Sequence, residues 1–200
     1  MAASAAIQRI FSGQTEACAI RGTSGARPRI LLSGAFNPLH QGHRKMALIA
    51  TELISGPVSY EISIDNVDKP KLTESELLRR LAQFSEEETV WVTRAATFAE
   101  KSVLFPGVVF AIGADTLQRI ALPEYYRNSM SQNNNLEQMQ EAIAQIEEQG
   151  CRLLVFGRLV ENRFLSMADF PLSNRLRDLC EPVPESLFRE DLSSTTLRKR

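Results

Sequence analysis

The only two histidines in the chain, His40 and His43, close the run Gly-Ala-Phe-Asn-Pro-Leu-His-Gln-Gly-His, which covers residues 34–43. Gly34 permits a tight turn after the apolar residues that precede it, and Gly42 lets the backbone approach a ligand closely. A helix is expected to begin here, so His43 would lie in its first turn, where unpaired N–H groups and the helix dipole attract anions. The run therefore predicts a phosphate-binding loop.

Histidines at this spacing can also be core residues or a pair of metal ligands. The three cysteines form no C-x-x-C pair, so a structural zinc site would lack its other ligands. We therefore favour phosphate contact, with the histidines as donors. The residues expected to form this loop are Gly34, Phe36, Asn37, His40, Gly42 and His43.

A second group of phosphate ligands is expected near the end of the chain, in the run Ser193-Ser194-Thr195-Thr196-Leu197-Arg198. Hydroxyl groups at a helix start can cap the helix and donate to a phosphate. Arg198 follows Ser194 by four residues, which places both side chains on one helix face. An ordinary N-cap followed by a basic tail would give the same pattern, but the first loop makes the phosphate interpretation the stronger one.

The elements that must position these residues alternate between strands and helices. Strands are predicted at residues 30–32, 58–64, 89–93, 108–112 and 152–156. Helices are predicted at residues 41–54 and 136–149, near Ser193, and after Thr73, where Leu77, Leu78, Leu81 and Phe84 would point inward. This order favours an α/β fold with a parallel, Rossmann-like sheet and helices on both faces, with ligands beyond the carboxyl ends of the strands.

The composition fits one globular domain, since 44% of the 200 residues are hydrophobic. We assign this domain to residues 29–200. Residues 1–28 are treated as a flexible N-terminal extension, with an organellar transit signal as the alternative. A formal charge of −1 argues against long nucleic acids as partners, and no apolar run reaches the length of a membrane span. The odd number of cysteines suits a reducing compartment, so a cytoplasmic location is expected.

The first loop resembles the T/H-x-G-H signature of the adenylyl- and cytidylyltransferase superfamily. Its Asn37-Pro38 form is most similar to the nicotinamide and nicotinate mononucleotide adenylyltransferases. The run 193–198 resembles the I-S-S-T-x-I-R motif of the same family. The resemblance implies a nucleotidyltransferase type of Rossmann-like fold. It also implies that His40, His43 and Arg198 are catalytic and that Ser193, Ser194 and Thr195 bind ATP.

Further stretches are similar to motifs of this family, in the family's order. By resemblance, the ATP-binding residues would include Lys69, Gly113, Asp115 and Arg158. Tyr126 takes the place of a tryptophan that stacks on the nicotinamide ring in the family, and Phe98 is a substitute for a second stacking tryptophan. The single tryptophan, Trp91, lies within a predicted strand and is expected to be a core residue instead.

The reaction implied is transfer of AMP from ATP to nicotinamide or nicotinate mononucleotide, with release of pyrophosphate. Mg²⁺ would be held mainly by nucleotide phosphates and water, with no protein metal site. The partners would be ATP and a pyridine mononucleotide, and relatives of this kind commonly form homo-oligomers. Two alternatives stay open: a cytidylyltransferase acting on a phosphorylated alcohol, although such enzymes usually carry Asp in place of Asn37, and a non-catalytic nucleotide-binding regulator.

Overall fold

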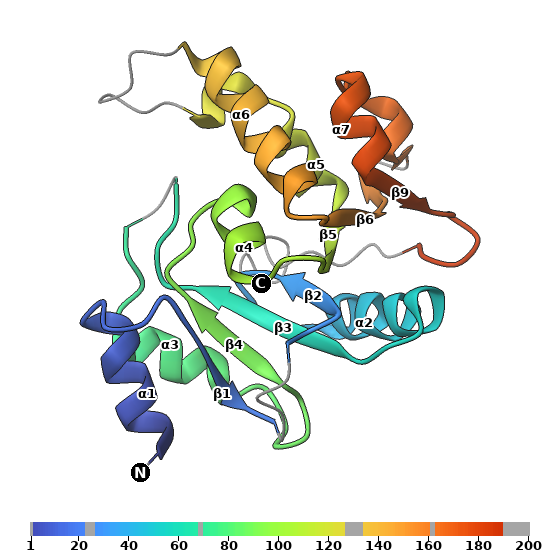
Figure 1. Ribbon diagram of the computed structural model, residues 1–200. Coiled ribbons are helices and arrows are strands. Elements are labelled where there is room, and N and C mark those ends of the chain that lie inside the picture. The colour runs from blue at the N-terminus through green and yellow to red at the C-terminus, as the bar shows by residue number, and fades with distance from the viewer. Residues whose placement is uncertain (1, 23–26, 68–69, 127–133, 161–162, 190–200) are drawn as a thin grey trace.

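The computed structural model describes residues 2–22, 27–67, 70–126, 134–160 and 163–189, and its centre is a seven-stranded sheet (Figure 1). The strands are β1 (Ala17–Arg21), β2 (Ile30–Ser33), β3 (Val58–Ser63), β4 (Val90–Thr93), β5 (Val109–Gly113), β6 (Arg152–Phe156) and β9 (Cys180–Val183). Their spatial order is β1-β4-β3-β2-β5-β6-β9. All neighbouring pairs run parallel except β1 and β4, which are antiparallel. The predicted α/β, Rossmann-like fold class is confirmed.

Helices connect the strands. They are α1 (Ala2–Phe11), α2 (Gln41–Ile54), α3 (Glu74–Leu81), α4 (Phe98–Leu104), α5 (Ala114–Ile120), α6 (Asn135–Glu148) and α7 (Asn174–Leu179). Two short 3₁₀ helices, η1 (Pro123–Tyr126) and η2 (Met167–Asp169), and a hairpin of β7 (Arg158–Val160) and β8 (Arg163–Leu165) complete the described chain. The predicted bounds of α2 and β6 are confirmed, whereas α4, α5, α7, β9 and the hairpin were not predicted.

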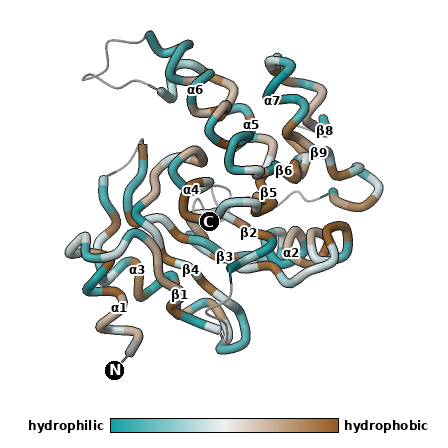
Figure 2. Tube along the Cα trace, in the orientation of Figure 1, coloured by the Kyte–Doolittle hydropathy of each residue, from teal (hydrophilic) through white to brown (hydrophobic). Residues whose placement is uncertain are grey.

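Each face of the sheet has its own hydrophobic core, because successive residues of a strand point to opposite faces. In β2, Ile30 and Leu32 pack with residues of α1, α2 and α3, while Leu31 packs with residues of α4, α5, α6 and α7. Figure 2 shows that the helices carry both hydrophobic and hydrophilic residues, as expected of helices that bury one side. The predicted arrangement with helices on both faces is therefore confirmed.

The helix predicted after Thr73 is α3, and its inward side differs from the prediction at one position. Leu77, Leu81 and Phe84 are buried, but Leu78 is 48% exposed. Leu77 and Leu81 are four residues apart and share one helix face, so Leu78, about 100° around the helix from Leu77, points away from it. The Thr73 side chain accepts a hydrogen bond from the backbone N–H of Glu76 and caps the helix, as its position predicts.

The N-terminal segment differs from the flexible extension predicted for residues 1–28. Residues 2–22 form α1 and β1, and β1 extends the sheet beyond β4. Ile7 and Ile10 are buried in the first core, at the three-residue spacing that brings side chains to one helix face. Composition alone hid this helix, because alanine and serine dominate the sequence around its apolar stripe.

None of the helices in the described parts of the chain is long and apolar enough to cross a membrane.

Candidate functional site

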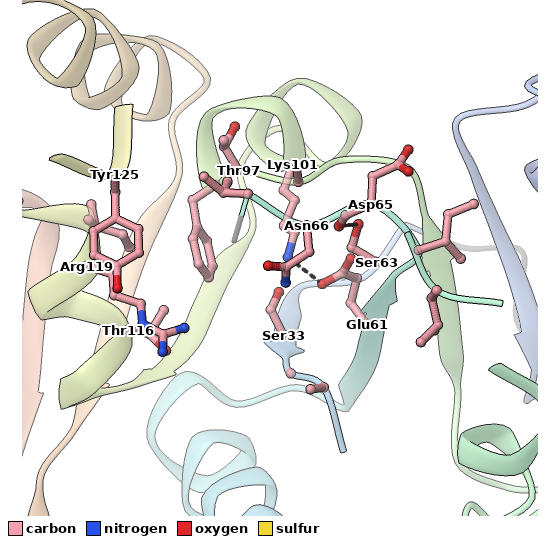
Figure 3. A pocket seen from close by; sticks show the side chains of 18 of the residues that line it. Ser33, Glu61, Ser63, Asp65, Asn66, Thr97, Lys101, Thr116, Arg119 and Tyr125 are labelled. Atoms are coloured by element: carbon pink, nitrogen blue, oxygen red, sulfur yellow. Dashed lines mark hydrogen bonds and ion pairs between the residues drawn. The ribbon is translucent and has the colours of Figure 1, made fainter. Parts of the chain in front are cut away.

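The strand order places the expected ligand crevice between β2 and β5. From β2 the chain proceeds to β3 and β4 on one side, and then returns to β5, β6 and β9 on the other. At such a reversal the connections leave the sheet in opposite directions, so a crevice opens beyond the carboxyl ends of the strands. A cavity of about 290 Å³ lies here (Figure 3). Its walls come from the ends of β2 and β3, the segment after β3, the start of α4, and the α5–η1 region.

The loop after β2 turns tightly around the ring of Phe36. Phe36 has φ of +43° and is only 1% exposed. A Cβ atom on Gly34 would lie 3.0 Å from this ring, so only glycine fits there without displacing it. Gly34 and Asn37 line the cavity, as predicted for nucleotide contacts. Phe36 was predicted to bind ATP, but its side chain packs in the first core and Phe36 is not among the residues that line the cavity.

Helix α3 holds this loop from the side. The Gln83 side chain, just beyond the helix, donates to the carbonyl of Phe36 at 2.9 Å and accepts from the N–H of Leu39 at 2.8 Å. Arg80 donates to the carbonyl of Ala35 at 3.0 Å. These three hydrogen bonds satisfy backbone groups on both sides of the Asn37-Pro38 bond, which is cis. The loop shape is therefore fixed by side chains from a distant part of the sequence.

The two histidines lie against each other at the start of α2. Their rings are stacked with centroids 3.8 Å apart, and the His40 backbone N–H donates to His43 Nδ1 at 3.3 Å. An Nδ1 atom that accepts leaves the ring proton on Nε2. Burial, with a smaller contribution from His40, lowers the pKa of His43 from 6.5 to about 3. His43 is therefore neutral at physiological pH and can donate one N–H to an anion.

Aromatic side chains line the part of the cavity formed by α4 and η1. Thr97 caps α4 in a reciprocal capping box with Glu100, and this fixes Phe98 at the first helical position. The Tyr126 hydroxyl donates to the carbonyl of Ile120 at 3.0 Å, and burial raises the pKa of Tyr126 to about 12. Phe98 and Tyr126, both predicted to contact the acceptor, thus face the same cavity.

Several lining residues were missed by the sequence reasoning. Tyr125 lies beside Tyr126 with its ring 5.7 Å from the Arg119 guanidinium. Glu61 on β3 and Lys101 on α4 form a buried ion pair in the cavity wall, with Nζ and Oε2 2.9 Å apart. A charged residue inside an apolar strand was the available signal for Glu61. The burial of Lys101 has no such signal, since it follows from the packing of α4.

The predicted nucleotide residues of β5 and β6 also come together. Gly113 is the N-cap of α5, and Asp115 in the first turn pairs with Arg158, which directly follows Gly157 at the end of β6. A Cβ on Gly113 would meet no atom within 4 Å, so the backbone there borders open space. Trp91, expected to be a core residue, is partly buried, packs against the second core and contacts Phe105 edge to face.

Five predicted site residues lie outside the described residues: Lys69, Ser193, Ser194, Thr195 and Arg198. The helix predicted near Ser193 lies there as well. Within the parts of the chain that the structure describes, no group of three or more His, Cys, Asp or Glu side chains could hold a metal ion. Of the predicted site residues that the structure describes, Gly34, Asn37, Phe98 and Tyr126 line one cavity, whereas the histidine pair and the Asp115–Arg158 pair are not among its lining residues.

One protein family matches most of the chain. None of the curated proteins matches the chain closely enough to count as a relative. The family described as cytidylyltransferase-like matches residues 31–200, which include every strand and helix of the fold except α1, β1 and the first residue of β2. The loop that carries the glycines and histidines thus lies at the carboxyl end of β2, among parallel strands. The chain is a member of the cytidylyltransferase-like family, and the protein is a nucleotidyltransferase.

Proposed function

We propose that this nucleotidyltransferase transfers AMP from ATP to nicotinamide or nicotinate mononucleotide and releases pyrophosphate. The observation that carries the proposal is the single cavity shared by the phosphate-binding loop and the aromatic side chains. Gly34 and Asn37 line one side of it, and Phe98 and Tyr126 line another. Aromatic walls suit a flat pyridine ring, which can stack on them.

The histidine loop would hold the phosphates of ATP. His43 is neutral and presents its Nε2–H from the first turn of α2, where the helix dipole also favours negative charge. Hydrogen-bond donors aimed at phosphate oxygens stabilise the charge that builds up during transfer. We assign the same role to His40, which stacks on His43.

The C-terminal run would hold the phosphates that leave. Phe188 packs edge to face on Phe156 at the end of β6, and Lys45 of α2 lies 5.7 Å from its ring. Ser194 and Arg198, with Ser193 and Thr195, lie outside the described residues and are assigned to the β- and γ-phosphates by their resemblance to the family motif.

The chemistry asks little of the protein beyond positioning. A phosphomonoester has its second pKa near 6, so the acceptor phosphate is already an anionic nucleophile at neutral pH. Its oxygen forms a bond to the α-phosphorus of ATP, the bond to the bridging oxygen breaks, and pyrophosphate leaves with the electron pair. Mg²⁺ bound with ATP would neutralise phosphate charge, with phosphates and water as its main ligands. Lys69 is assigned to the acceptor phosphate or the triphosphate.

Pyrophosphate release tests the proposal directly. The purified protein is given ATP and Mg²⁺ with each mononucleotide in turn, with a control that lacks an acceptor. Acceptor-dependent release, together with formation of the dinucleotide, supports the proposal. The same assay with CTP and a phosphorylated alcohol separates the rival reaction of this family. Release from CTP and silence with ATP would overturn the assignment.

A further inference from the structure

A buried ion pair forms part of the cavity wall and has no role in the chemistry described above. Glu61 is 0% exposed and Lys101 is 7% exposed, and Lys101 Nζ lies 2.9 Å from Glu61 Oε2. The Thr93 hydroxyl donates to the other carboxylate oxygen, Oε1, at 2.6 Å. Burying two charges is expensive and seldom stabilises a fold more than apolar packing would. A pair placed in a ligand cavity is therefore better explained by the ligand than by stability.

The pair retains hydrogen-bonding capacity. Within the described chain, Glu61 Oε2 makes no hydrogen bond in addition to its ion pair. An ammonium group carries three N–H donors, and the Lys101 group also lies 4.9 Å from the centre of the Phe98 ring, which itself lines the cavity. A ligand group with one acceptor and one donor would complement such a pair. A carboxamide has both, whereas a carboxylate only accepts.

The charges of the wall favour the same choice. Glu61 and Lys101 together are neutral, so a carboxylate beside them would leave a net negative charge in a poorly solvated place. The two arginines among the described lining residues, Arg80 and Arg119, have other partners than the Glu61–Lys101 pair. Arg80 pairs with Glu76 at 2.9 Å, and Arg119 lies with Tyr125 on the wall opposite Lys101 (Figure 3).

We infer that the Glu61–Lys101 pair binds the substituent on the acceptor ring and selects a neutral carboxamide over a carboxylate. The preferred acceptor is then nicotinamide mononucleotide. This inference rests on the proposed function, because it assumes that the cavity receives a pyridine ring next to Phe98. It adds a specificity-determining pair that the sequence motifs do not contain.

Competition between the two mononucleotides measures this selection. The ratio of kcat/KM for the amide over that for the carboxylate is expected to be at least about tenfold in the natural protein, from one unfavourable charge contact. Glu61→Gln removes the negative charge and leaves Lys101 positive. This variant should lower the ratio by about tenfold or more. The double variant Glu61→Gln with Lys101→Met makes the wall neutral again and should return the ratio toward the amide.

Glu74→Gln is the matched control, because Glu74 is an exposed carboxylate in the first turn of α3 and is not among the residues that line the cavity. Its ratio should stay as in the natural protein. A natural protein that prefers the carboxylate, or a folded Glu61→Gln variant with an unchanged ratio, overturns the inference and leaves the proposed function intact. If Glu61→Gln fails a thermal unfolding check, the ratio of the natural protein decides. Absence of both turnover and binding with either mononucleotide overturns the proposed function itself.

Discussion

At the scale of single residues, the site depends on a histidine that stays neutral. His43 is held by a hydrogen bond from the His40 backbone and by edge-to-face contact with Phe36, whose ring centroid is 5.0 Å away. The hydrogen bond occupies Nδ1 and leaves Nε2 to act as donor. A neutral donor avoids the cost of burying a charge while still contributing a fixed dipole toward a phosphate.

Loss of this donor should lower turnover more than binding. His43→Ala is expected to lower kcat by about 10²–10³, the usual effect of removing a transition-state donor. Steady-state kinetics with ATP and the preferred mononucleotide measure it. Gln41→Ala is the control, because Gln41 is exposed in the same helical turn. Near-normal turnover of the His43 variant would contradict its assignment.

The same residue should make stability depend on pH. The pKa of His43 is about 3 in the folded protein and ordinarily 6.5, so between these values the unfolded chain binds a proton that the folded chain does not. Its contribution to stability is therefore complete above pH 6.5 and declines as the pH falls below that value. Thermal unfolding at about pH 7.5 and about pH 5 should show a smaller decline for His43→Gln than for the natural protein. Equal declines would argue against a depressed pKa.

At the scale of elements, α3 acts as a support for the loop after β2. Gln83→Ala removes two hydrogen bonds to loop backbone and should cost about 1–3 kcal/mol in the free energy of unfolding. Because the loop carries the histidines, kcat should fall as well, with less change in KM. Gln83→Glu can still accept from Leu39 but cannot donate to Phe36, so it should give a partial loss. Leu78→Ala, on the exposed side of α3, is the control. A Gln83 variant with normal kcat would limit its role to stability.

The elements also show what sequence could and could not predict. Periodicity and caps predicted α2 and β6 with the observed bounds, because their patterns are long or flanked by clear turn residues. Short helices such as α4, with only about two turns, give too short a periodic pattern to be recognised, although the Thr97–Glu100 capping box was present in the sequence. The loop after β2 was predicted from its glycine and histidine spacing, whereas the residues after β5 were predicted from resemblance to the family. Glu61 and Lys101, which are 40 residues apart, meet only through the tertiary packing of α4 on the sheet.

At the scale of the whole molecule, the N-terminal segment is part of the core. Ile10 of α1 is 0% exposed and packs in the same cluster as residues of β2 and α3. Ile10→Ala should therefore cost roughly 2–5 kcal/mol, from lost burial and the cavity left behind. Thermal or denaturant unfolding measures the change. Leu48→Ala, at a site 60% exposed, should change stability little. Equal stability of the two variants would mean that α1 does not pack as described.

The two outermost strands of the sheet, β1 and β9, affect how readily the protein aggregates at high concentration. An open sheet exposes backbone groups along its outermost strands, and these can recruit a strand from another molecule. Here β1 runs against the direction of its neighbour, with an irregular register between Ala19 and Arg21, and β9 carries Pro182, which has no N–H to donate. Both outer strands of the described sheet are thus poor templates. Copies of this protein should resist strand-to-strand aggregation, and any oligomer should associate through side-chain surfaces.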